Sequence, residues 1–252
     1  MSPQDIQIAE GGPQPRRRYL DMVLSYQDPD YLQQLLLYNR ALRQRNAVLK
    51  KIKKREARLD DLETWNAGLV EYAEKITRSR QRFVAEFEGI FQDSLERISS
   101  HRDKLRLRLI YSSSQEEEDY AGALRRHAPR DASLGFTSVG PHRQNLGFEQ
   151  GSLDITRFGS QGQKRSLVLA LRIAQFSFLR RNLGLAPILL IDDVIRELDA
   201  GRRGAFVELL KESGQAIFTT PDLDGMDSYP GDLKADTRVL YVSEPGQADW
   251  QS

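Results

Sequence analysis

Two stretches of the chain determine its fold: FGSQGQKR at residues 158–165 and PILLIDD at residues 187–193. The first is a glycine-punctuated turn that opens a helix, and the second is a short apolar strand that ends in two carboxylates. Free backbone N–H groups at a helix start bind anions, and ligands bind at the carboxyl ends of buried parallel strands. Together the two stretches predict the back half of a nucleotide-binding site.

The front half of such a site, a phosphate-binding P-loop, is absent from these 252 residues. The glycines at 159 and 162 and the lysine at 164 do not have the GxxxxGK[ST] spacing. Plainer interpretations of each stretch stay open: Ser160 is an ordinary N-cap, and Asp192 with Asp193 caps a following helix. Against the second of these, two adjacent acids directly after a buried strand are costly unless a cation or donor meets them.

The composition excludes several classes of function. The 37 basic and 36 acidic residues nearly cancel, so the net charge indicates no particular partner. The absence of cysteine excludes disulfides, thiol nucleophiles and thiolate metal sites. The first residues do not resemble a signal peptide, and no apolar run approaches the ~20 residues of a membrane helix. We expect a soluble, cytoplasmic protein that makes no membrane contact.

The first hundred residues predict helices. One begins near Arg17, and the sequence Asp28-Pro29-Asp30 caps a second that runs from Tyr31 to about Glu56. Near Asp60-Asp61 the chain turns back into a third helix that reaches about Ser99. The two long helices carry heptad-like seams, namely Leu35, Asn39, Leu42, Asn46 and Leu49 on one and Trp65, Leu69, Tyr72, Ile76, Ser79, Phe83, Phe87 and Ile90 on the other. They predict an antiparallel helical hairpin.

The remainder predicts strands and helices in alternation. Strands are expected at 104–111, 136–139, 188–191, 215–219 and 238–242, a β-hairpin over 146–155 around Gly151, and helices at 120–127, 163–182 and 201–213. The alternation after residue 158 favours a parallel α/β sheet. Of the three histidines, only His142 lies in a motif, the turn Gly140-Pro141-His142-Arg143, where turn stabilisation and ligand binding both stay open. No pair of histidines has metal-site spacing.

One predicted helix is strongly basic. Its candidate contacts to nucleic-acid phosphates are Arg40, Arg43, Arg45, Lys50, Lys51, Lys53 and Lys54, which Arg55 and Arg58 extend. Such a helix would give salt-sensitive, sequence-independent binding. The alternative is a solvated face that pairs with the acids at 60, 61 and 63.

At this point the motifs resemble a known family. Residues 159–163 resemble the signature loop of ABC-type ATPases, residues 188–193 their Walker B strand, and Glu197-Leu198-Asp199 their D-loop. Further stretches are similar to the RecF family of DNA-repair proteins: SPQD at 2–5, RRRYLD at 16–21, YNRALRQRN at 38–46, GPHR at 140–143 and FTT at 218–220. The resemblance covers nearly the whole chain.

The resemblance implies an α/β ABC-ATPase-like head with a partial parallel sheet and an inserted antiparallel hairpin arm. Residues 1–21 would be a remnant of the N-terminal ATPase lobe, 22–103 the arm, and 104–252 the C-terminal ATPase subdomain. Ser160, Gln161, Gly162 and Gln163 would contact ATP bound by the opposite subunit of a homodimer. Asp192 would serve Mg²⁺, Asp193 would be the catalytic carboxylate, and Glu197 and Asp199 would line the dimer interface.

The family implies ATP-dependent binding of single-stranded and gapped duplex DNA, recombinase loading with RecR and RecO as partners, a link to the SOS response, and a weak DNA-dependent ATPase. This sequence departs from the family pattern in two places. A strand and P-loop are expected upstream of Ser2, so we expect either the C-terminal portion of a longer protein or a degenerate relative that does not hydrolyse ATP alone. Gln144-Asn145 stand where the family usually has acids.

Two other classes remain as rivals. The first is a non-enzymatic module in which the arm binds DNA or a protein partner and the head is a scaffold. The second is an ABC transporter ATPase, against which the arm inserted ahead of the signature loop argues.

Overall fold

A computed structural model of the chain describes residues 2–98, 106–110 and 119–192, and beyond these only residues 204, 206, 208, 210, 212–219, 238, 240–244 and 247–250. The chain divides into two compact units, Gln4–Ala186 and a second unit made of Met1–Pro3 with Pro187–Ser252. Each unit is described by itself. None of the described helices combines the length and apolar character that crossing a bilayer requires.

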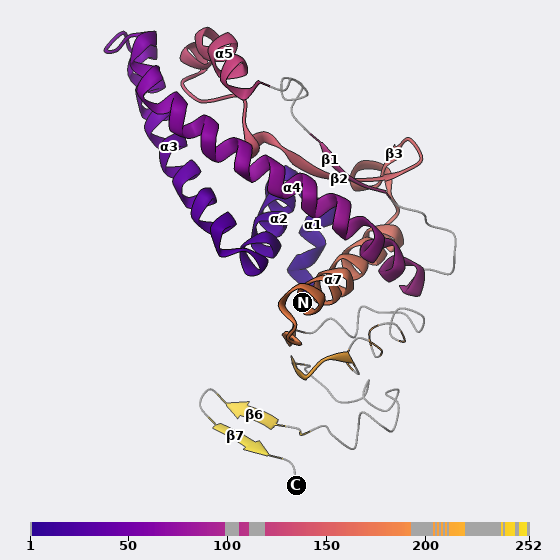
Figure 1. Cartoon of the computed structure of the whole chain (residues 1–252). Helices are drawn as coiled ribbons and strands as arrows, with labels where there is room; N and C mark the ends of the chain where they lie inside the picture. The colour runs from indigo at the N-terminus through magenta and orange to yellow at the C-terminus, as the bar shows by residue number, and fades with distance from the viewer. Residues whose placement is uncertain are drawn as a thin grey trace. The chain divides into compact units, whose positions relative to one another are not determined.

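The larger unit begins with four helical segments: η1 (Pro3–Ile6), α1 (Gln7–Glu10), α2 (Pro13–Gln27) and α3 (Pro29–Lys53). Asp28 caps α3, because its carboxylate accepts a hydrogen bond from the N–H of Asp30 at 2.9 Å and Pro29 occupies the first turn. The short η2 (Leu59–Leu62) then leads into the 36-residue α4 (Glu63–Ile98). Helices α3 and α4 lie side by side as a hairpin (Figure 1), as the sequence predicts.

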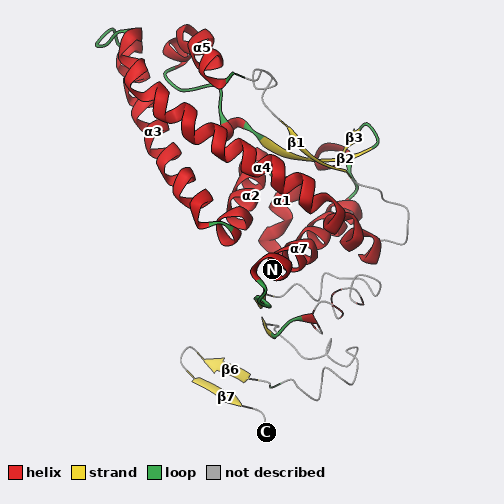
Figure 2. Cartoon of the chain, in the orientation of Figure 1, coloured by secondary structure: helices red, strands yellow, loops and turns green. Residues whose placement is uncertain are grey.

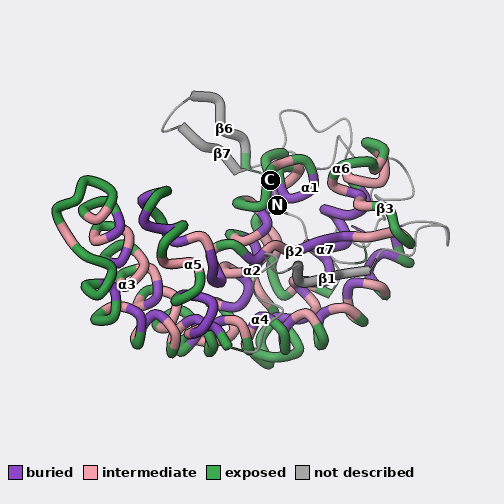
Figure 3. Tube along the Cα trace, turned by 90° about the horizontal axis from the view of Figure 1, so that it is seen from above, coloured by how far each residue is buried: buried purple, intermediate pink, exposed green. Residues whose placement is uncertain are grey.

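The seam of this hairpin differs from the predicted seam on both helices: on α4 the buried positions are Asn66, Ala73, Arg80 and Phe91 where Trp65, Tyr72, Ser79 and Ile90 were expected. On α3 the buried side chains include Tyr38 and Arg45 where Asn39 and Asn46 were expected. On α4 the buried positions run in heptad steps through Asn66, Leu69, Ala73, Ile76, Arg80, Phe83 and Phe87. Tyrosine and arginine occupy interior positions because they pack long side chains and find hydrogen-bond partners for their polar ends. Buried and exposed residues accordingly alternate along α4 (Figure 3).

The other half of α4 packs against α7 (Gln161–Leu183). The rings of Phe83 and Phe87 stack at 4.6 Å between centroids, and Phe178 of α7 meets both of them edge-on. On α2, the Tyr19 hydroxyl donates to the carbonyl of Leu171 at 3.0 Å. Helix α7 starts two residues earlier than predicted and ends at Leu183, where Gly184 caps it with a φ of 67° that glycine easily adopts.

A small antiparallel sheet completes this unit, with strand order β1 (Arg106–Ile110), β2 (Asn145–Gln150) and β3 (Leu153–Asp154). The expected hairpin around Gly151 is present. Beside the sheet, α6 (Ile155–Phe158) precedes α7, and Figure 2 shows how strongly helix predominates over strand.

Helix α5 (Tyr120–Leu134) packs near the turn between α3 and α4, where Leu49, Leu62 and Ala132 form a buried cluster. It is longer than predicted, since Pro129 does not end it. The strand expected at 136–139 is wrong. Side chains accept the hydrogen bonds that a neighbouring strand would otherwise accept: Thr137 N–H donates to Asn46 and Ser138 N–H donates to Asp131.

In the smaller unit, β4 (Ile188–Asp192) pairs in parallel with β5 (Gln215–Thr219), which confirms the expected parallel strands. Described residues between 204 and 212 are helical, as predicted. The last predicted strand begins two residues later, as β6 (Leu240–Glu244), and pairs with β7 (Gln247–Trp250).

Candidate functional site

The turn before α7 is a capping box. Ser160 Oγ accepts a hydrogen bond from the N–H of Gln163 at 3.2 Å, and Gln163 Oε1 accepts one from the N–H of Ser160 at 2.9 Å. The Gln163 amide also donates to Gln150 Oε1 of β2 at 3.1 Å. Gly159 is required sterically, because a Cβ there would lie 2.6 Å from the Ile155 carbonyl oxygen. This exposed turn presents a helix N-terminus at which an anion can bind.

At the carboxyl end of β4, the exposed Asp192 is oriented by its neighbour on β5. Thr219 Oγ1 donates to Asp192 Oδ1 at 2.6 Å, and these two residues are register partners in the parallel pair. Sequence reasoning placed Thr219 at the end of a strand and in a family stretch, but it missed this contact. Within the described residues, no three His, Asp or Glu side chains gather as a metal site. The Asp192 carboxylate is an oxygen ligand of the kind that Mg²⁺ takes together with phosphate oxygens.

Three of the predicted site residues lie outside the described residues, namely Asp193, Glu197 and Asp199. The structure therefore gives their side chains no position. The same holds for the expected start of the helix at residue 201.

The basic strip on α3 is exposed at Arg40, Arg43, Lys50, Lys51 and Lys53. Lys54 is exposed as well, but it follows the last helical residue, Lys53, as do the basic residues at 55 and 58.

Arg45 is a wrong prediction, because it is fully buried and cannot contact DNA. Its Nη1 lies 2.9 Å from Asp131 Oδ2 and donates to Thr137 Oγ1 at 2.7 Å, while its Nε donates to Asn66 Oδ1 at 3.0 Å. This network joins α3, α4, α5 and the segment after α5. The sequence could not show that Arg45 is buried, because it lies among other basic residues and its hydrogen-bond partners are 21 to 92 residues away.

A second buried arginine, Arg80 of α4, holds the Gly140 turn in place. Its Nη1 donates to the Pro141 carbonyl at 2.7 Å and to Gln144 Oε1 at 2.9 Å. Its Nη2 lies 2.6 Å from Asp21 Oδ1 on α2, and its Nε donates to Tyr31 Oη at 3.1 Å. Burial opposes the positive charge, but Tyr31 and Asp21 outweigh it and raise the pKa of Arg80 above its ordinary value. Sequence reasoning missed Arg80 because its four partners come from three distant segments, namely α2, α3 and the Gly140 turn.

The turn at η3 (Pro141–Arg143) contains a neutral histidine. His142 Nε2 lies 3.0 Å from the Thr137 carbonyl oxygen, which can only accept, so Nε2 carries the hydrogen. Nδ1 is then the acceptor for the Tyr38 hydroxyl at 2.6 Å. Burial lowers the pKa of His142 to about 4. Both ring nitrogens are occupied, so the structure favours turn stabilisation over ligand binding for this residue.

Gly140 allows the turn to approach two phenols. Its φ is 132°, and a Cβ added there would overlap the hydroxyl oxygens of Tyr38 and Tyr120.

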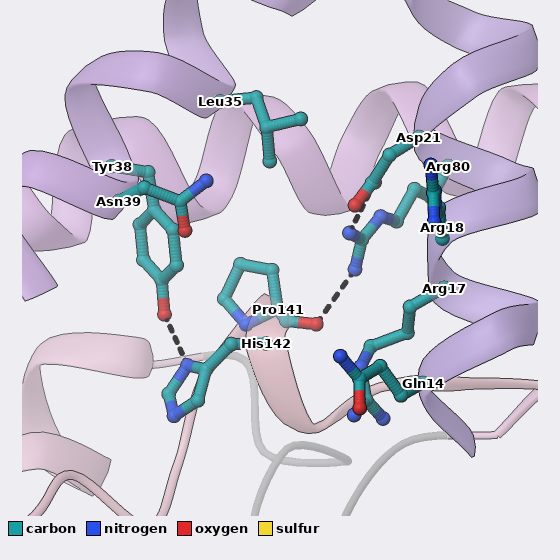
Figure 4. A pocket seen from close by; sticks show the side chains of 10 residues that line it. All are labelled: Gln14, Arg17, Arg18, Asp21, Leu35, Tyr38, Asn39, Arg80, Pro141 and His142. Carbon is teal, nitrogen blue, oxygen red and sulfur yellow. Dashed lines mark hydrogen bonds and ion pairs between the residues drawn. The ribbon is translucent and has the colours of Figure 1, made fainter. Parts of the chain in front are cut away.

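Beside this turn lies a pocket of about 340 Å³ (Figure 4). It is lined by Gln14, Arg17, Arg18, Asp21, Leu35, Tyr38, Asn39, Arg80, Pro141 and His142.

The chain is similar to several proteins of known name, although no protein-family model matches it. It is 41% identical over 250 residues to the DNA replication and repair protein RecF of Leptospira interrogans serovar Lai, covering 99% of this chain and 67% of that protein. Against RecF of Agathobacter rectalis the identity is 38%, over 88% of this chain and 61% of the relative. The chain thus spans about two thirds of the length of its Leptospira relative.

Solved structures of RecF proteins also resemble this chain. The chain superposes on the recombination mediator protein RecF bound to ATPrS, from the RecFOR pathway, with a TM-score of 0.85, 30% identity and coverage of 100% of this chain and 67% of the other. The ATP-bound RecF structure gives a TM-score of 0.84.

A parallel strand pair, a long helix with a capped turn at its start and a helical hairpin define the class as an ABC-type ATPase head with a hairpin arm. The chain belongs to the RecF family. The expected fold class is thereby confirmed.

Proposed function

We propose that the chain acts in DNA replication and repair as a RecF-type protein that binds single-stranded and gapped duplex DNA under the control of ATP. The observation that carries this proposal is the 41% identity to RecF over 99% of the chain. In the family role, DNA binding supports recombinase loading with RecR- and RecO-like partners. The relatives of known structure are described as recombination mediators of the RecFOR pathway, which supports those partners.

For DNA contact we propose the exposed cations of α3 and the residue that follows it: Arg40, Arg43, Lys50, Lys51, Lys53 and Lys54. In this proposal residues 22–103 form the DNA-binding arm, flanked by a lobe remnant at 1–21 and the ATPase subdomain at 104–252. Lysine and arginine side chains neutralise phosphates and release counterions, so affinity falls steeply with salt.

For ATP we propose binding across a homodimer. The exposed N-terminus of α7, with Ser160 to Gln163, would contact the γ-phosphate of a nucleotide held by the opposite subunit. Asp192 would hold Mg²⁺ while Thr219 fixes the carboxylate orientation. The metal, when bound, supplies positive charge that neutralises the phosphate oxygens. Asp193 would orient the attacking water, and Glu197 and Asp199 would line the dimer interface.

This 252-residue chain contains no P-loop sequence. Because the P-loop supplies most direct phosphate contacts in nucleotide hydrolases, we propose that the chain alone does not hydrolyse ATP. Measurable ATPase activity of the purified chain that is lost in Asp193→Asn would contradict this statement.

Fluorescence anisotropy with a labelled gapped duplex at 50 and 200 mM salt would test the DNA contact. Replacing Lys50, Lys51, Lys53 and Lys54 one at a time by glutamine should lower the slope of log affinity against log salt by about 1 for each phosphate that is no longer neutralised. The matched control is Lys75→Gln, an exposed lysine whose ammonium pairs with Glu71 on α4. Equal slopes for all five variants and the unmodified chain would rule out the strip.

A second candidate is a non-enzymatic module in which the arm alone binds its partner. The exposed cations along α3 favour it, because they offer a phosphate-binding surface that needs no nucleotide. Salt-sensitive DNA binding that is unchanged by ATP, in the chain and in a full-length RecF relative, would select this candidate over the ATP-controlled one.

A further inference from the structure

The pocket beside the Gly140 turn carries an excess of positive charge. Its lining contains three arginines, Arg17, Arg18 and Arg80, and one carboxylate, Asp21. That carboxylate already accepts hydrogen bonds from Arg80 Nη2 at 2.6 Å and from the Tyr31 hydroxyl at 2.5 Å. Within the described residues no carboxylate forms an ion pair with Arg17 or Arg18. Of the carboxylates that the structure describes, only Asp21 attracts Arg17, and it does so without an ion pair.

Arg17 is held close to other cations. It is half-buried on α2, and its hydrogen bond is a long one, from Nη1 to the Gln144 carbonyl at 3.3 Å. Burial, followed by the charges of Arg80 and Arg143, lowers the pKa of Arg17 from its ordinary value. An anion in the pocket would offset the cost of burying Arg17 and its repulsion by the neighbouring arginines, because the anion would supply hydrogen-bond acceptors and an opposite charge.

The shape and the remaining lining suit a compact oxyanion. The volume of about 340 Å³ lies at the lower end of the range of small-ligand sites. Leu35, Tyr38 and Pro141 contribute apolar surface from different sides, and Asn39 and Gln14 contribute amide groups (Figure 4). Arginine forks match the geometry of phosphate oxygens and bind them with two hydrogen bonds each.

We propose that this pocket binds a phosphate group between Arg17 and Arg18, at a site separate from the residues assigned to ATP. The ion pair between the buried Arg80 and the partly buried Asp21 is part of its lining. None of the residues from 160 to 163, nor Asp192, lines it. The phosphate belongs either to a nucleic-acid strand or to a free nucleotide, and the two sources share the same recognition chemistry.

The test uses inorganic pyrophosphate as the probe and the complete chain as the protein. Isothermal titration should show one saturable site, and the side-chain Nε–H resonances of Arg17 and Arg18 should shift along the titration. Arg18→Gln should weaken binding by about tenfold. Arg18 is exposed, so this variant should fold normally. The matched control is Arg181→Gln, which removes an exposed arginine in the last turn of α7 and should leave the affinity unchanged.

Absence of saturable binding at millimolar pyrophosphate would overturn the proposal. So would binding that Arg18→Gln leaves intact, since the anion would then occupy another place such as the start of α7. The four lysine variants of the α3 strip should retain pyrophosphate binding. A failure of the proposed DNA contact is therefore distinguishable from a failure of this pocket.

Competition identifies the source of the phosphate. The competitors are adenosine monophosphate, a short oligonucleotide with a 5′-phosphate, and the same oligonucleotide without it. Displacement of pyrophosphate by both oligonucleotides indicates backbone phosphates, and displacement only by the phosphorylated one indicates a strand end. Displacement by the mononucleotide alone indicates a free nucleotide. If none of the three displaces pyrophosphate, the pocket is not a site for biological phosphate groups and the proposal is wrong.

Discussion

The hydroxyl of Tyr38 on α3 donates to Nδ1 of His142 across 2.6 Å and ties the hairpin to the Gly140 turn. Burial raises the pKa of Tyr38 well above its ordinary value, so the phenol keeps the proton that it donates. His142 in turn donates from Nε2 to the Thr137 carbonyl. The turn is thus fixed by a chain of directional bonds, and it leaves little room for additional atoms.

The Gly140 turn should not tolerate a side chain. In Gly140→Ala the new methyl group overlaps the hydroxyls of Tyr38 and Tyr120, and a φ of 132° is itself unfavourable for alanine. We expect a loss of about 3 kcal/mol in the free energy of unfolding, measured by urea denaturation.

Gly151→Ala is the matched control for this substitution. Gly151 also has a positive φ, 61°, but a Cβ there meets nothing within 4 Å. Only the left-handed backbone is then penalised, by about 1 kcal/mol. Equal losses in the two alanine variants would show that the phenols do not confine the turn.

His142 should make stability fall in mild acid. Its folded-state pKa of about 4 lies below the ordinary value of 6.5, so the unfolded chain binds more protons between these two pH values. Its contribution to stability is therefore complete above pH 6.5 and is lost as the pH falls toward 4, by about 3 kcal/mol in all.

Urea titrations at several pH values would measure this effect. Carboxylates titrate in the same range, so the informative quantity is the difference between the chain and His142→Gln. That difference should shrink steadily from pH 6.5 to 4. A difference independent of pH would mean that folding does not shift the pKa of His142.

The buried pair of Arg45 and Asp131 should behave as a unit. Removing one partner leaves a fully buried charge, so Arg45→Met and Asp131→Leu should each cost about 3–5 kcal/mol. The double variant should cost clearly less than the two single losses together. Strict additivity in urea denaturation would mean that the two charges do not stabilise each other.

The capping box should contribute modestly to stability. Ser160→Ala removes the acceptor for the Gln163 N–H and should lower the free energy of unfolding by about 1 kcal/mol. Gln161→Ala, at the next and also exposed position, makes no cap bond and should have almost no effect. If both substitutions are neutral, the cap is not needed to start α7.

The sequence was sufficient for elements whose signals are local. The start of α3 follows from Asp28 and Pro29, the end of α7 from Gly184, and the parallel strand at 188–192 from its run of aliphatic residues. The heptad spacing also predicted the hairpin. It placed Asn39 and Asn46 in the seam, whereas Tyr38 and Arg45 are the buried residues. Periodicity alone gives no reason to bury Arg45 rather than Asn46, because both side chains are polar.

The site was less predictable because its decisive contacts are distant in sequence. The capping turn at Ser160 could be found from spacing, and the acid at Asp192 from its place after a strand. Arg80 gave no signal, since its partners at 21, 31, 141 and 144 assemble only in the fold. The strand predicted at 136–139 is absent for a related reason. The side chains of Asn46 and Asp131, which are distant from it or outside it in sequence, accept hydrogen bonds from its backbone N–H groups.

Helix α4 joins two regions with one uninterrupted piece of backbone. Phe83 rests on Phe178 of α7, and Glu63 lies at the far end of the hairpin, about 30 Å away along the helix axis. A tilt of about 10° at the phenylalanine contact therefore displaces the hairpin end by about 5 Å, the distance of one helical turn. Helix α7, which Ser160 caps, contacts α4 in the half that is farther from Glu63. A small tilt of α4 at this contact would therefore be amplified into a larger displacement of the basic end of α3 at the hairpin end.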